Sequence, residues 1–432
     1  MQHHSFAPTP PMGWNSWDCY GATVTEAEVR GNAEYMARHL KKYGWEFIVV
    51  DIQWYEPGAV SDLYRPFVRL ETDGYSRLVP AVNRFPSAEG GRGFKPLADD
   101  VHSLGLKFGI HMMRGIPRQA VHDHTPIKGT KVTARDIAHT CSFCGWNTDM
   151  YGVDASKEGA QEYYHSLFEM YAEWGVDYIK VDDIADSWLH GGPHLAEMEL
   201  IRRAIDHAGR PMVLSLSPGP APVKHADFLE ANANMWRMTD DFWDRWPLLL
   251  DMFDRCETWQ GRPKPGCWPD CDMLPLGRIG VRCSHPDRMT SFTRDEQLTM
   301  MTLWTIFRSP LMFGGEMRNN DEWTLSLLTN RDVLDMHRNS FGARLVSRTA
   351  GRVIWAAEGP HGERYAALFN IGEETADISV ALAELGISGP AYADNLWTRE
   401  ERRELAGTLA ATVAPHGAAL FRIITEMNPS CI

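Results

Sequence analysis

The sequence lacks the features that mark nucleic-acid binding or membrane insertion. Its 432 residues include 43 Lys and Arg against 57 Asp and Glu, which gives a formal net charge of −14 at pH 7. Most of the surface should therefore repel a polyanion, and we expect no nucleic-acid partner. Apolar runs such as residues 47–50 end after a few residues, far short of the roughly 20 that cross a bilayer. We expect no membrane partner either.

Cysteines and processing signals are also scarce. Eight cysteines in so long a chain are too few for a disulfide scaffold, and they leave the redox compartment open. No Asn-x-Ser/Thr acceptor with a permitted middle residue occurs. The N-terminus shows no basic segment followed by an apolar stretch. We expect a cytoplasmic protein, or a secreted or periplasmic one whose signal peptide is absent from this chain; a homo-oligomer is compatible with the sequence.

Short apolar or aromatic runs alternate with amphipathic stretches over the first three quarters of the chain. Eight runs are expected to be strands: 12–17, 47–54, 107–113, 177–183, 211–217, 235–241, 267–274 and 310–315. Between them lie segments with apolar residues three and four apart, such as 25–43, 157–174 and 294–308, which favours helices. Eight strands alternating with helices predict an α/β fold, a (β/α)₈ TIM barrel, over residues 1–338.

The pattern changes after about residue 340. Five short alternating runs are separated by turns rich in Gly, Pro and Glu: 344–346, 353–357, 365–371, 376–380 and 418–423. Such spacing is typical of antiparallel strands with one buried face. It predicts a small C-terminal antiparallel β-sandwich domain over residues 339–432.

Carboxylates and tryptophans follow several of the predicted barrel strands. The carboxyl ends of barrel strands surround one mouth, so these side chains should meet there. They include Trp17, Asp51, Trp54, Asp182, Asp241, Asp270 and Asp272. Acidic groups beside indole rings suit a sugar, whose C–H faces stack on the rings while its hydroxyls donate to the carboxylates. The alternative is that a chain with 16 tryptophans buries many of them in its core.

Strand alternation orders the carboxylates near residue 180. Lys180 and Asp182 should face the same side of their strand, so the ammonium favours the ionised form of Asp182. Asp183 should point elsewhere, and we expect it to cap the next helix. An ionised carboxylate at a barrel mouth is one of the two groups that glycoside cleavage requires.

Spacing leaves two candidates for the second carboxyl group. Arg237 and Asp241 share a side of the sixth strand, which would let the guanidinium hold substrate hydroxyls beside an acid. Asp240 is a rival for the same role, and the pattern of residues does not decide between them.

A metal site is the main alternative use of the cysteines. Cys141 and Cys144 could pair with Cys267 and Cys271, but zinc motifs normally repeat one tight spacing and the second pair departs from it. We expect no metal and no organic cofactor.

Five motifs, in chain order, resemble those of glycoside hydrolase family 27, whose best-known members are α-galactosidases. They are PPMGWNSW at 10–17, YIKVD at 178–182, WRMTDD at 236–241, WPDCDML at 268–274 and SPLMFGG at 309–315. Residues 395–398 and 414–420 resemble parts of the family's C-terminal β-domain. The resemblance thus runs over nearly the whole chain.

The resemblance implies a retaining, exo-acting glycoside hydrolase that acts on an oligo- or polysaccharide without a cofactor. It implies that Asp182 is the nucleophile and that Asp241, rather than Asp240, is the general acid/base. It also implies substrate contacts, to which Trp54 and Asp272 are added from their strand-end positions. The full set of expected substrate-binding residues is Trp17, Asp51, Trp54, His111, Lys180, Ser217, Arg237 and Asp272.

Two departures from the family pattern bear on the sugar. Ile52 replaces the second of two adjacent aspartates and removes an acceptor for the 4-hydroxyl and 6-hydroxyl region of galactose. Ser217 replaces a glutamate that binds the 2-hydroxyl group, as in the family's α-N-acetylgalactosaminidases. We expect release of terminal α-linked galactose; α-N-acetylgalactosaminidase, isomaltose-releasing dextranase and β-L-arabinopyranosidase activities are the alternatives. A non-catalytic carbohydrate-binding barrel is disfavoured because both carboxylates are present.

Overall fold

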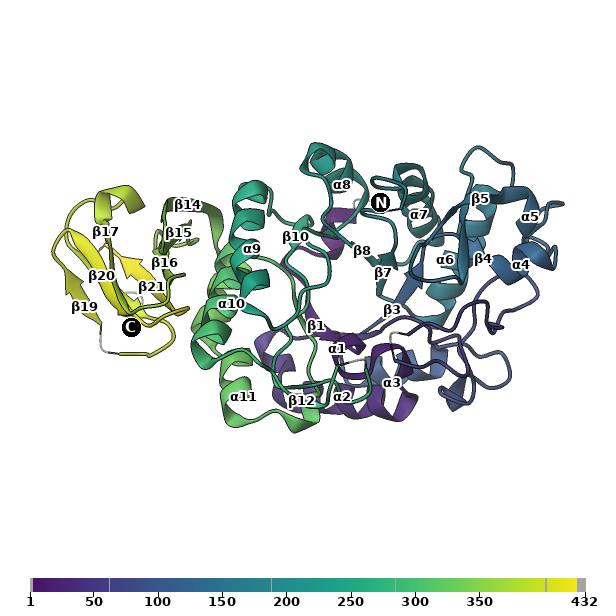
Figure 1. Cartoon of the computed structure of the whole chain (residues 1–432), viewed down its shortest axis with the longest axis horizontal. Coiled ribbons are helices and arrows are strands. Elements are labelled where there is room, and N and C mark those ends of the chain that lie inside the picture. Colours follow the sequence, from purple (N-terminus) through teal and green to yellow (C-terminus); the bar gives the residue numbers. More distant parts are fainter. Residues whose placement is uncertain (1–2, 62, 188, 284, 401, 426–432) are drawn as a thin grey trace.

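Eight parallel strands form a ring at the centre of the larger part of the chain (Figure 1). In the computed structural model, which describes residues 3–61, 63–187, 189–283, 285–400 and 402–425, their order is β10-β9-β8-β7-β3-β2-β1-β13. Leu274, just past β10, bridges in parallel to Phe313 and closes the ring. The strands are β1 (Met12–Asn15), β2 (Phe47–Val50), β3 (Lys107–Met113), β7 (Tyr178–Asp182), β8 (Val213–Leu216), β9 (Met235–Arg237), β10 (Trp268–Asp270) and β13 (Leu311–Phe313). All eight predicted runs are confirmed, and the TIM-barrel prediction with them.

Amphipathic helices cover the outside of the ring. The helix α2 begins with a capping box in which the Thr25 and Glu28 side chains satisfy each other's backbone amides. The helix α6 is followed by Gly175, whose φ of +85° lets the chain turn back toward β7. The main outer helices are α2 (Glu26–His39), α3 (Lys95–Ser103), α6 (Ala160–Trp174), α7 (Leu195–Ala208), α8 (Ala226–Asn232), α9 (Trp246–Trp259), α10 (Arg294–Phe307), α11 (Glu322–Leu328) and α12 (Arg331–Asn339).

A small antiparallel sheet is inserted between β3 and α6, and the sequence did not predict it. Its strands are β4 (Ile116–Pro117), β5 (Ala138–Phe143) and β6 (Met150–Val153), in the order β4-β6-β5, with the short helices α4 (Arg118–His122) and α5 (Ala134–Ile137) between them. Because β5 is largely exposed and short of apolar residues, it has no clear alternation. The insertion lies at the right-hand end of Figure 1, and it follows the carboxyl end of β3.

The C-terminal part is an antiparallel β-domain, as predicted. A six-stranded sheet, β14-β15-β16-β21-β18-β19, packs on the pair β17-β20, and a separate apolar cluster fills the space between them. Its strands are β14 (Phe341–Thr349), β15 (Arg352–Glu358), β16 (Arg364–Asn370), β17 (Ala376–Ala381), β18 (Ala391–Asn395), β19 (Arg403–Leu405), β20 (Thr408–Val413) and β21 (Ala418–Ile424). Of these, β18, β19 and β20 were not predicted.

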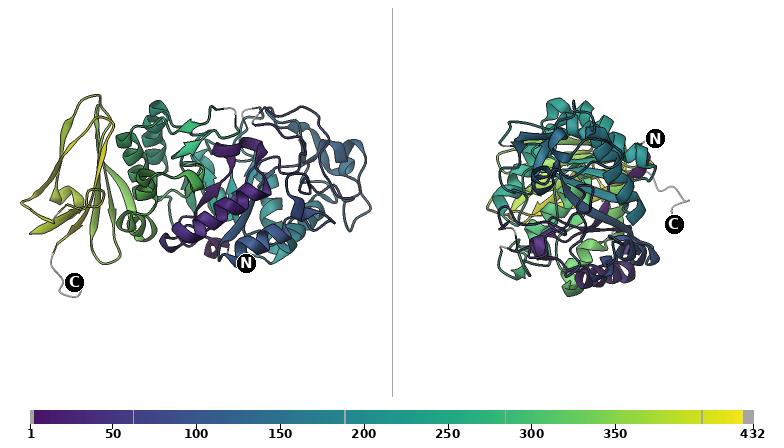
Figure 2. Two further views of the ribbon diagram at one scale, coloured as in Figure 1. Left: turned by 90° about the horizontal axis from the view of Figure 1, so that it is seen from below. Right: turned by 90° about the vertical axis from the view of Figure 1, so that its right-hand side faces the viewer.

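The β-domain is fastened to the barrel through α9 and α10 (Figure 2). His416 stacks on Trp246 with ring centroids 3.8 Å apart, and its backbone carbonyl accepts from the Thr299 hydroxyl at 2.6 Å. Trp397 donates from its indole N–H to the Thr302 hydroxyl at 2.8 Å. These contacts hold the β-domain against the outer helices of the barrel.

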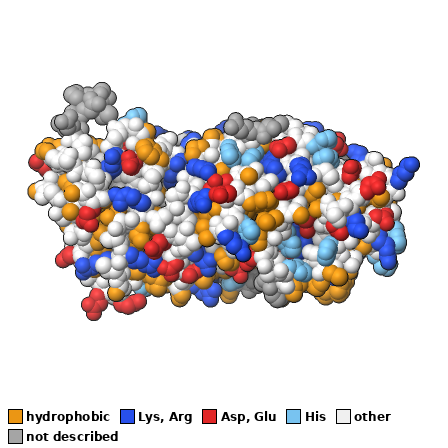
Figure 3. Space-filling view, turned by 90° about the horizontal axis from the view of Figure 1, so that it is seen from above, with side chains coloured by type: hydrophobic (Ala, Val, Ile, Leu, Met, Phe, Trp, Pro, Cys, Tyr) orange, Lys and Arg blue, Asp and Glu red, His pale blue; other side chains and the backbone are white. Residues whose placement is uncertain are grey.

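Charges of both signs are mixed over the face shown in Figure 3, and neither sign covers a large continuous part of it. Within the described ranges, no helix is both long enough and apolar enough to cross a bilayer.

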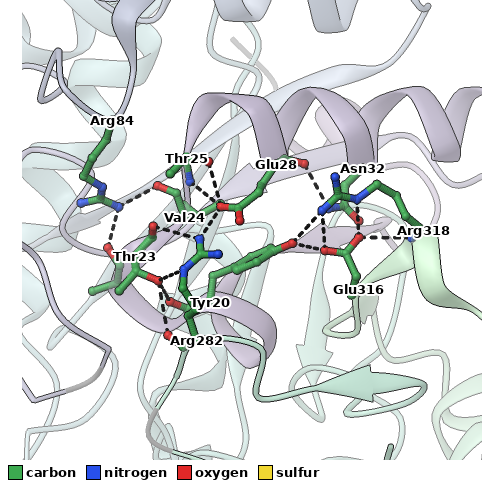
Figure 4. Close-up of polar contacts among 11 residues, drawn as sticks. Tyr20, Thr23, Val24, Thr25, Glu28, Asn32, Arg84, Arg282, Glu316 and Arg318 are labelled. Atoms are coloured by element: carbon green, nitrogen blue, oxygen red, sulfur yellow. Dashed lines mark hydrogen bonds and ion pairs between the residues drawn. The ribbon is translucent and has the colours of Figure 1, made fainter. Parts of the chain in front are cut away.

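A buried polar network joins the loop after β1 to the loop after β13. Tyr20 donates its hydroxyl proton to the Glu316 carboxylate, and Arg318 donates to the same carboxylate from Nε at 2.7 Å and from Nη2 at 2.9 Å. Figure 4 shows these three side chains converging beside α2, where the Asn32 side chain accepts from the Met317 amide at 3.0 Å. The network holds together the loops that follow β1 and β13.

Replacing Glu316 by Ala should lower the free energy of unfolding by about 2–3 kcal/mol, because Tyr20 and Arg318 would lose a charged hydrogen-bond partner. Glu316 is only 2% exposed, so water cannot fully replace the carboxylate. Urea denaturation of the variant would measure the loss. Glu404→Ala, which changes an exposed residue of β19, is the control and should stay within about 0.5 kcal/mol of the parent.

Candidate active site

The predicted catalytic residues meet at the carboxyl ends of the barrel strands. Asp182 is the last residue of β7, and Asp51 follows β2 directly. The register between β3 and β7 pairs His111 with Lys180 and Met113 with Asp182. The side chains of Lys180 and Asp182 lie on one side of β7, as strand alternation predicted.

The Asp182 carboxylate is held by one donor on each oxygen. His111 Nε2 lies 3.2 Å from Oδ2, and the Asp183 amide donates to Oδ1 at 2.9 Å. Burial alone would raise the pKa of Asp182, but the His111 hydrogen bond and the positive charges of Lys180 and Arg237 hold that pKa well below its usual range. Asp182 is therefore a fixed, ionised carboxylate at neutral pH, and its side chain is 14% exposed.

Lys180 is anchored between two carboxylates. Its Nζ donates to Asp51 Oδ2 at 2.9 Å, and the same oxygen accepts from Asn15 Nδ2 at 2.7 Å. Burial lowers the pKa of Lys180, but Asp51 and Asp182 more than reverse this, so its pKa lies above the usual range. The pKa of Asp51 is lowered despite burial, because Lys180 and His111 stabilise its charged form. Asp51, Lys180 and Asp182 therefore all stay ionised.

A second charged cluster faces the first from β9 and β10. Arg237 Nη2 lies 2.9 Å from Asp241 Oδ1 and 3.2 Å from Asp272 Oδ2. The Asp241 side chain is 57% exposed, whereas Asp272 is buried and also accepts from the Phe242 amide at 2.8 Å. Asp240 lies beside this cluster, where its carboxylate accepts from the Asp241 amide at 2.9 Å. Asp241 is thus the carboxyl group of this cluster that is both open to solvent and paired with Arg237.

Three buried carboxyl groups in and around this cluster have raised pKa values: Asp272, which the sequence predicted as a substrate contact, Asp270, and Asp18, which the sequence did not single out. Burial raises the pKa of Asp272, although Arg237 opposes it. Burial and the nearby charge of Asp272 raise the pKa of Asp270 to about 7. Burial also raises the pKa of Asp18, whose Oδ2 has no hydrogen-bond partner within the described ranges. Asp18 directly follows Trp17, a predicted site residue. This position in the sequence could have identified Asp18 as a further candidate.

Aromatic rings extend the site outward from β1. Trp17 is partly exposed and stacks on Tyr64 with ring centroids 6.4 Å apart and an interplanar angle of 20°. Tyr64 in turn packs on Trp146, with centroids 5.5 Å apart. Three successive βα loops therefore contribute one ring each, and Trp17 remains a predicted substrate contact.

Three predicted substrate contacts are enclosed by protein instead. Trp54 is 0% exposed, packs against Phe94 and Trp174, and donates its indole N–H to the His111 carbonyl at 2.8 Å. Trp54 therefore supports β3 from the core, and its contact with substrate stays a prediction. The His111 ring is also fully buried, and its polar contact is with Asp182 rather than with open solvent.

Ser217 is the third of these residues. It is 0% exposed, and its hydroxyl donates to the Val181 carbonyl at 3.3 Å. The structure thus gives this side chain a backbone partner, and its contact with a sugar hydroxyl stays a prediction. The short hydroxyl group fits under the turn after β8, where the Ile184 amide also donates to the Ser217 carbonyl at 3.0 Å.

Asp183 does not cap a helix, contrary to prediction. The next helix, α7, begins only at Leu195, and Asp183 forms an ion pair with Arg114 at 2.9 Å. Arg114 also pairs with Glu197 at 2.9 Å. Asp183 has a φ of +57°, a conformation that Asp tolerates better than most residues and that turns its amide toward Asp182. The Asp183 amide therefore helps to position the Asp182 carboxylate.

The cysteines and acidic groups do not gather as a metal site. In the part of the chain that the structure describes, no three His, Cys, Asp or Glu side chains are placed to hold one ion. Cys271 lies beside Cys256, with their sulfur atoms 3.7 Å apart, and Cys141 is exposed. Cys144 is buried near Asp183, and burial raises the pKa of its thiol.

The arrangement supplies the groups for acid-assisted nucleophilic substitution. One carboxylate is fixed and ionised, and a second, solvent-open carboxyl group is held by an arginine. The first is suited to attack on an electrophilic carbon, and the second to proton transfer with a leaving group or water. Lys180, Asp51, Arg237 and Asp272 provide donors and acceptors for hydroxyl groups around them.

Two family models match the chain. Residues 155–339 match the model described as α-galactosidase A, and residues 349–423 match that of the α-galactosidase C-terminal β-sandwich domain. Curated relatives include α-galactosidase 2 of Arabidopsis thaliana, 25% identical over 98% of this chain and 91% of its own length. The α-galactosidase of Coffea arabica is 28% identical over 96% of this chain and 93% of its own length.

Solved structures match more strongly. A family 27 β-L-arabinopyranosidase from Geobacillus stearothermophilus is 62% identical, with a TM-score of 0.98 over 99% of both chains. A putative α-N-acetylgalactosaminidase from Bacillus halodurans is 57% identical, with a TM-score of 0.89 over 97% of this chain and 98% of the other. Both chains match over the barrel and the β-domain together.

Proposed function

The chain belongs to glycoside hydrolase family 27, and we propose that this glycoside hydrolase releases terminal L-arabinopyranose from β-L-arabinopyranosides with retention of configuration. The observation that carries the sugar assignment is the 62% identity, over 99% of both chains, with a β-L-arabinopyranosidase. The curated α-galactosidases are far less similar, at 25–28% identity. Ile52 supports the same assignment through the family resemblance.

In the first step, an Asp182 oxygen attacks the anomeric carbon and the glycosidic bond breaks. The bond's electron pair goes to the leaving oxygen, which takes the proton of Asp241. Asp182 suits this role because its charge is maintained by His111 and Lys180 and its orientation is fixed by hydrogen bonds to both oxygens. The product of this step is a covalent ester between the sugar and Asp182.

In the second step, Asp241 takes a proton from water, and the water oxygen attacks the anomeric carbon. The ester bond to Asp182 breaks, which releases the sugar and restores the carboxylate. The solvent-open position of Asp241 gives water and the leaving group access to it, and Arg237 keeps it directed at the site. Two inversions at the same carbon give net retention.

The sugar assignment rests on what surrounds C5. A β-L-arabinopyranoside has the ring stereochemistry of an α-D-galactopyranoside but no hydroxymethyl group at C5. By the family resemblance, Ile52 takes the place of an aspartate that accepts hydrogen bonds in the 4-hydroxyl and 6-hydroxyl region. Here Ile52 is 1% exposed and joins the main apolar cluster beside Asp51. With Ile52 at this position, the site lacks the hydrogen-bond acceptor that a 6-hydroxyl group would need. Asp51 can still accept a hydrogen bond from the 4-hydroxyl group.

A substrate panel tests the proposed function. Aryl glycosides of β-L-arabinopyranose, α-galactose and α-N-acetylgalactosamine would be compared by kcat/KM, with dextran assayed for release of isomaltose. We expect the β-L-arabinopyranoside to be preferred by about tenfold or more, since a missing or added polar contact changes transition-state binding by at least this much. Equal or better turnover of another substrate would overturn the sugar assignment, and inactivity toward all four would overturn the proposed function.

Replacing Ile52 by Asp should move the preference toward the α-galactoside by about tenfold to a hundredfold in relative kcat/KM. The new carboxylate would restore an acceptor for the 6-hydroxyl and would leave a buried charge unpaired with the pentopyranoside. Ile52→Leu is the matched control, because it keeps an apolar side chain of equal volume and should retain the original preference. An unchanged ratio in Ile52→Asp, with the protein folded, would contradict the role assigned to Ile52.

An α-galactosidase is the second candidate. It is favoured by the two family models and by the curated relatives of matching length. The pair formed by Lys180 and Asp51 is compatible with either sugar, because both carry the same 2-, 3- and 4-hydroxyl groups. The two candidates therefore differ only at C5, and the panel separates them.

A further inference from the structure

A second pocket lies beside the mouth of the barrel, outside the charged clusters described above. It has a volume of about 760 Å³ and is lined by residues 67–70 of the loop after β2 and by residues of α4, α5, β5 and β6 in the insertion after β3. These two loops leave the strands that carry Asp51 and His111. The pocket is therefore built on the same side of the barrel as the candidate active site.

Arginines dominate the charge of this pocket. Arg69 and Arg135 are exposed, and Arg118 lies with its guanidinium 4.7 Å from the Tyr151 ring centroid and 5.3 Å from that of Phe143. Among the described residues, none of these three arginines forms an ion pair with a carboxylate, and Arg118 donates only to the Met150 carbonyl, at 3.1 Å. Three arginines without carboxylate partners are notable in a chain with a net charge of −14.

The acidic residues of the pocket do not neutralise these arginines. Asp149 is 5% exposed, and its Oδ2 accepts from Gln53 Nε2 at 2.9 Å and from the Tyr55 hydroxyl at 3.0 Å. Burial raises the pKa of Asp149. Asp123 lies 3.1 Å from the ring of its neighbour His122. The pocket thus presents a positively charged surface with donors free to face a ligand.

A continuous set of contacts joins the pocket to the candidate active site. The ring of Tyr64 lies between Trp17 at the mouth and Trp146 in the insertion. Three residues beyond Tyr64, the Phe67 amide donates to the Thr148 hydroxyl at 2.8 Å, and both residues line the pocket. A glycan whose terminal sugar lies at Asp182 can therefore continue along these rings toward the arginines.

We propose that this pocket binds a uronate unit in the glycan from which the terminal sugar is released. The proposal rests on the proposed function, since it concerns the leaving part of the same substrate. The guanidinium group presents paired N–H donors that match a carboxylate. The Phe67 and Tyr151 rings lie against the Arg118 guanidinium, with centroids 5.7 Å and 4.7 Å away, and hold it in place. The enzyme then prefers acidic glycans to neutral ones through contacts remote from the bond that breaks.

Direct binding tests the proposal without any turnover. The probes are a trisaccharide of β-1,4-linked D-glucuronate and cellotriose, its neutral counterpart, titrated into the full chain by calorimetry. We expect the glucuronate to bind about tenfold more tightly at low salt, and this difference to shrink as the ionic strength rises. Equal affinity for the two trisaccharides, or binding of neither, would overturn the proposal.

Variants assign the binding to the pocket. The double variant Arg69→Gln/Arg135→Gln should weaken glucuronate binding by about tenfold, while kcat/KM for an aryl glycoside stays within about twofold. Arg352→Gln, an exposed change on β15 of the β-domain, is the control and should bind as the parent does. Arg118→Lys, which keeps the charge but not the paired donors, should also weaken binding. Unchanged affinity in both pocket variants would contradict the assignment.

The failure of this proposal is distinguishable from failure of the proposed function. Inactivity on the whole substrate panel would refute the enzyme assignment even if the glucuronate binds. Activity on the panel together with equal affinity for the two trisaccharides would refute only the uronate pocket.

Discussion

Asp182→Ala should lower kcat on an aryl β-L-arabinopyranoside by on the order of 10⁴-fold or more, because the variant has no group to form the covalent intermediate. The fold should survive, since Asp182 lies at the end of β7 and its side chain is partly open. Initial rates and a thermal melt would measure both effects. A fall in kcat of less than a hundredfold would contradict the nucleophile assignment.

Azide supplies a chemical control for this variant. A small anion can enter the space left by the carboxylate and attack the anomeric carbon in its place. With an activated substrate, Asp182→Ala should then regain turnover and give a glycosyl azide of inverted configuration. A product of retained configuration would place Asp182 in the acid/base role instead.

Asp241→Ala should lower kcat/KM on an alkyl or oligosaccharide substrate by about 10³- to 10⁴-fold, because the leaving oxygen would have to depart without a proton. An aryl glycoside with an acidic leaving group needs little protonation, so its kcat/KM should fall much less. The dependence on leaving-group pKa, measured with a series of aryl glycosides, would therefore steepen in the variant.

Asp240→Ala is the matched control for Asp241. It removes an adjacent carboxyl group that is also exposed and that accepts a hydrogen bond from the Asp241 amide. We expect a loss of less than about tenfold, with no change in leaving-group dependence. If Asp240→Ala instead produced the large, leaving-group-dependent loss, the two roles would have to be exchanged.

The barrel was predictable because its strands are buried on both sides. Continuous apolar runs such as the one in β2 leave little choice other than a parallel strand, and the helices between them keep a 3.6-residue period. The insertion sheet β4-β6-β5 was not predictable in the same way. Its strands are short and β5 is mostly exposed, so the hydrophobic pattern that marks a strand is missing.

The candidate site was predictable where backbone geometry decides the outcome. Alternation placed Lys180 beside Asp182, and the structure brings Lys180 between Asp51 and Asp182. Alternation does not say how deep a side chain lies. Trp54 follows the end of β2 like a substrate-binding residue, but Phe94 and Trp174 from distant segments enclose it. Asp183 was misassigned for a similar reason, since its partner Arg114 comes from another strand end.

The central claim, a retaining mechanism with Asp182 as nucleophile, is tested most directly by trapping the covalent intermediate. In a ring-fluorinated β-L-arabinopyranosyl fluoride, the ring fluorine destabilises the cationic transition states of both steps, but the good leaving group, fluoride, restores the rate of the first. The ester on the enzyme should therefore form quickly and be released slowly. Peptide mass spectrometry of the inactivated enzyme should then find one sugar on Asp182. A label on Asp183, Asp240 or Asp241, or first-formed sugar of inverted configuration by NMR, would contradict the claim.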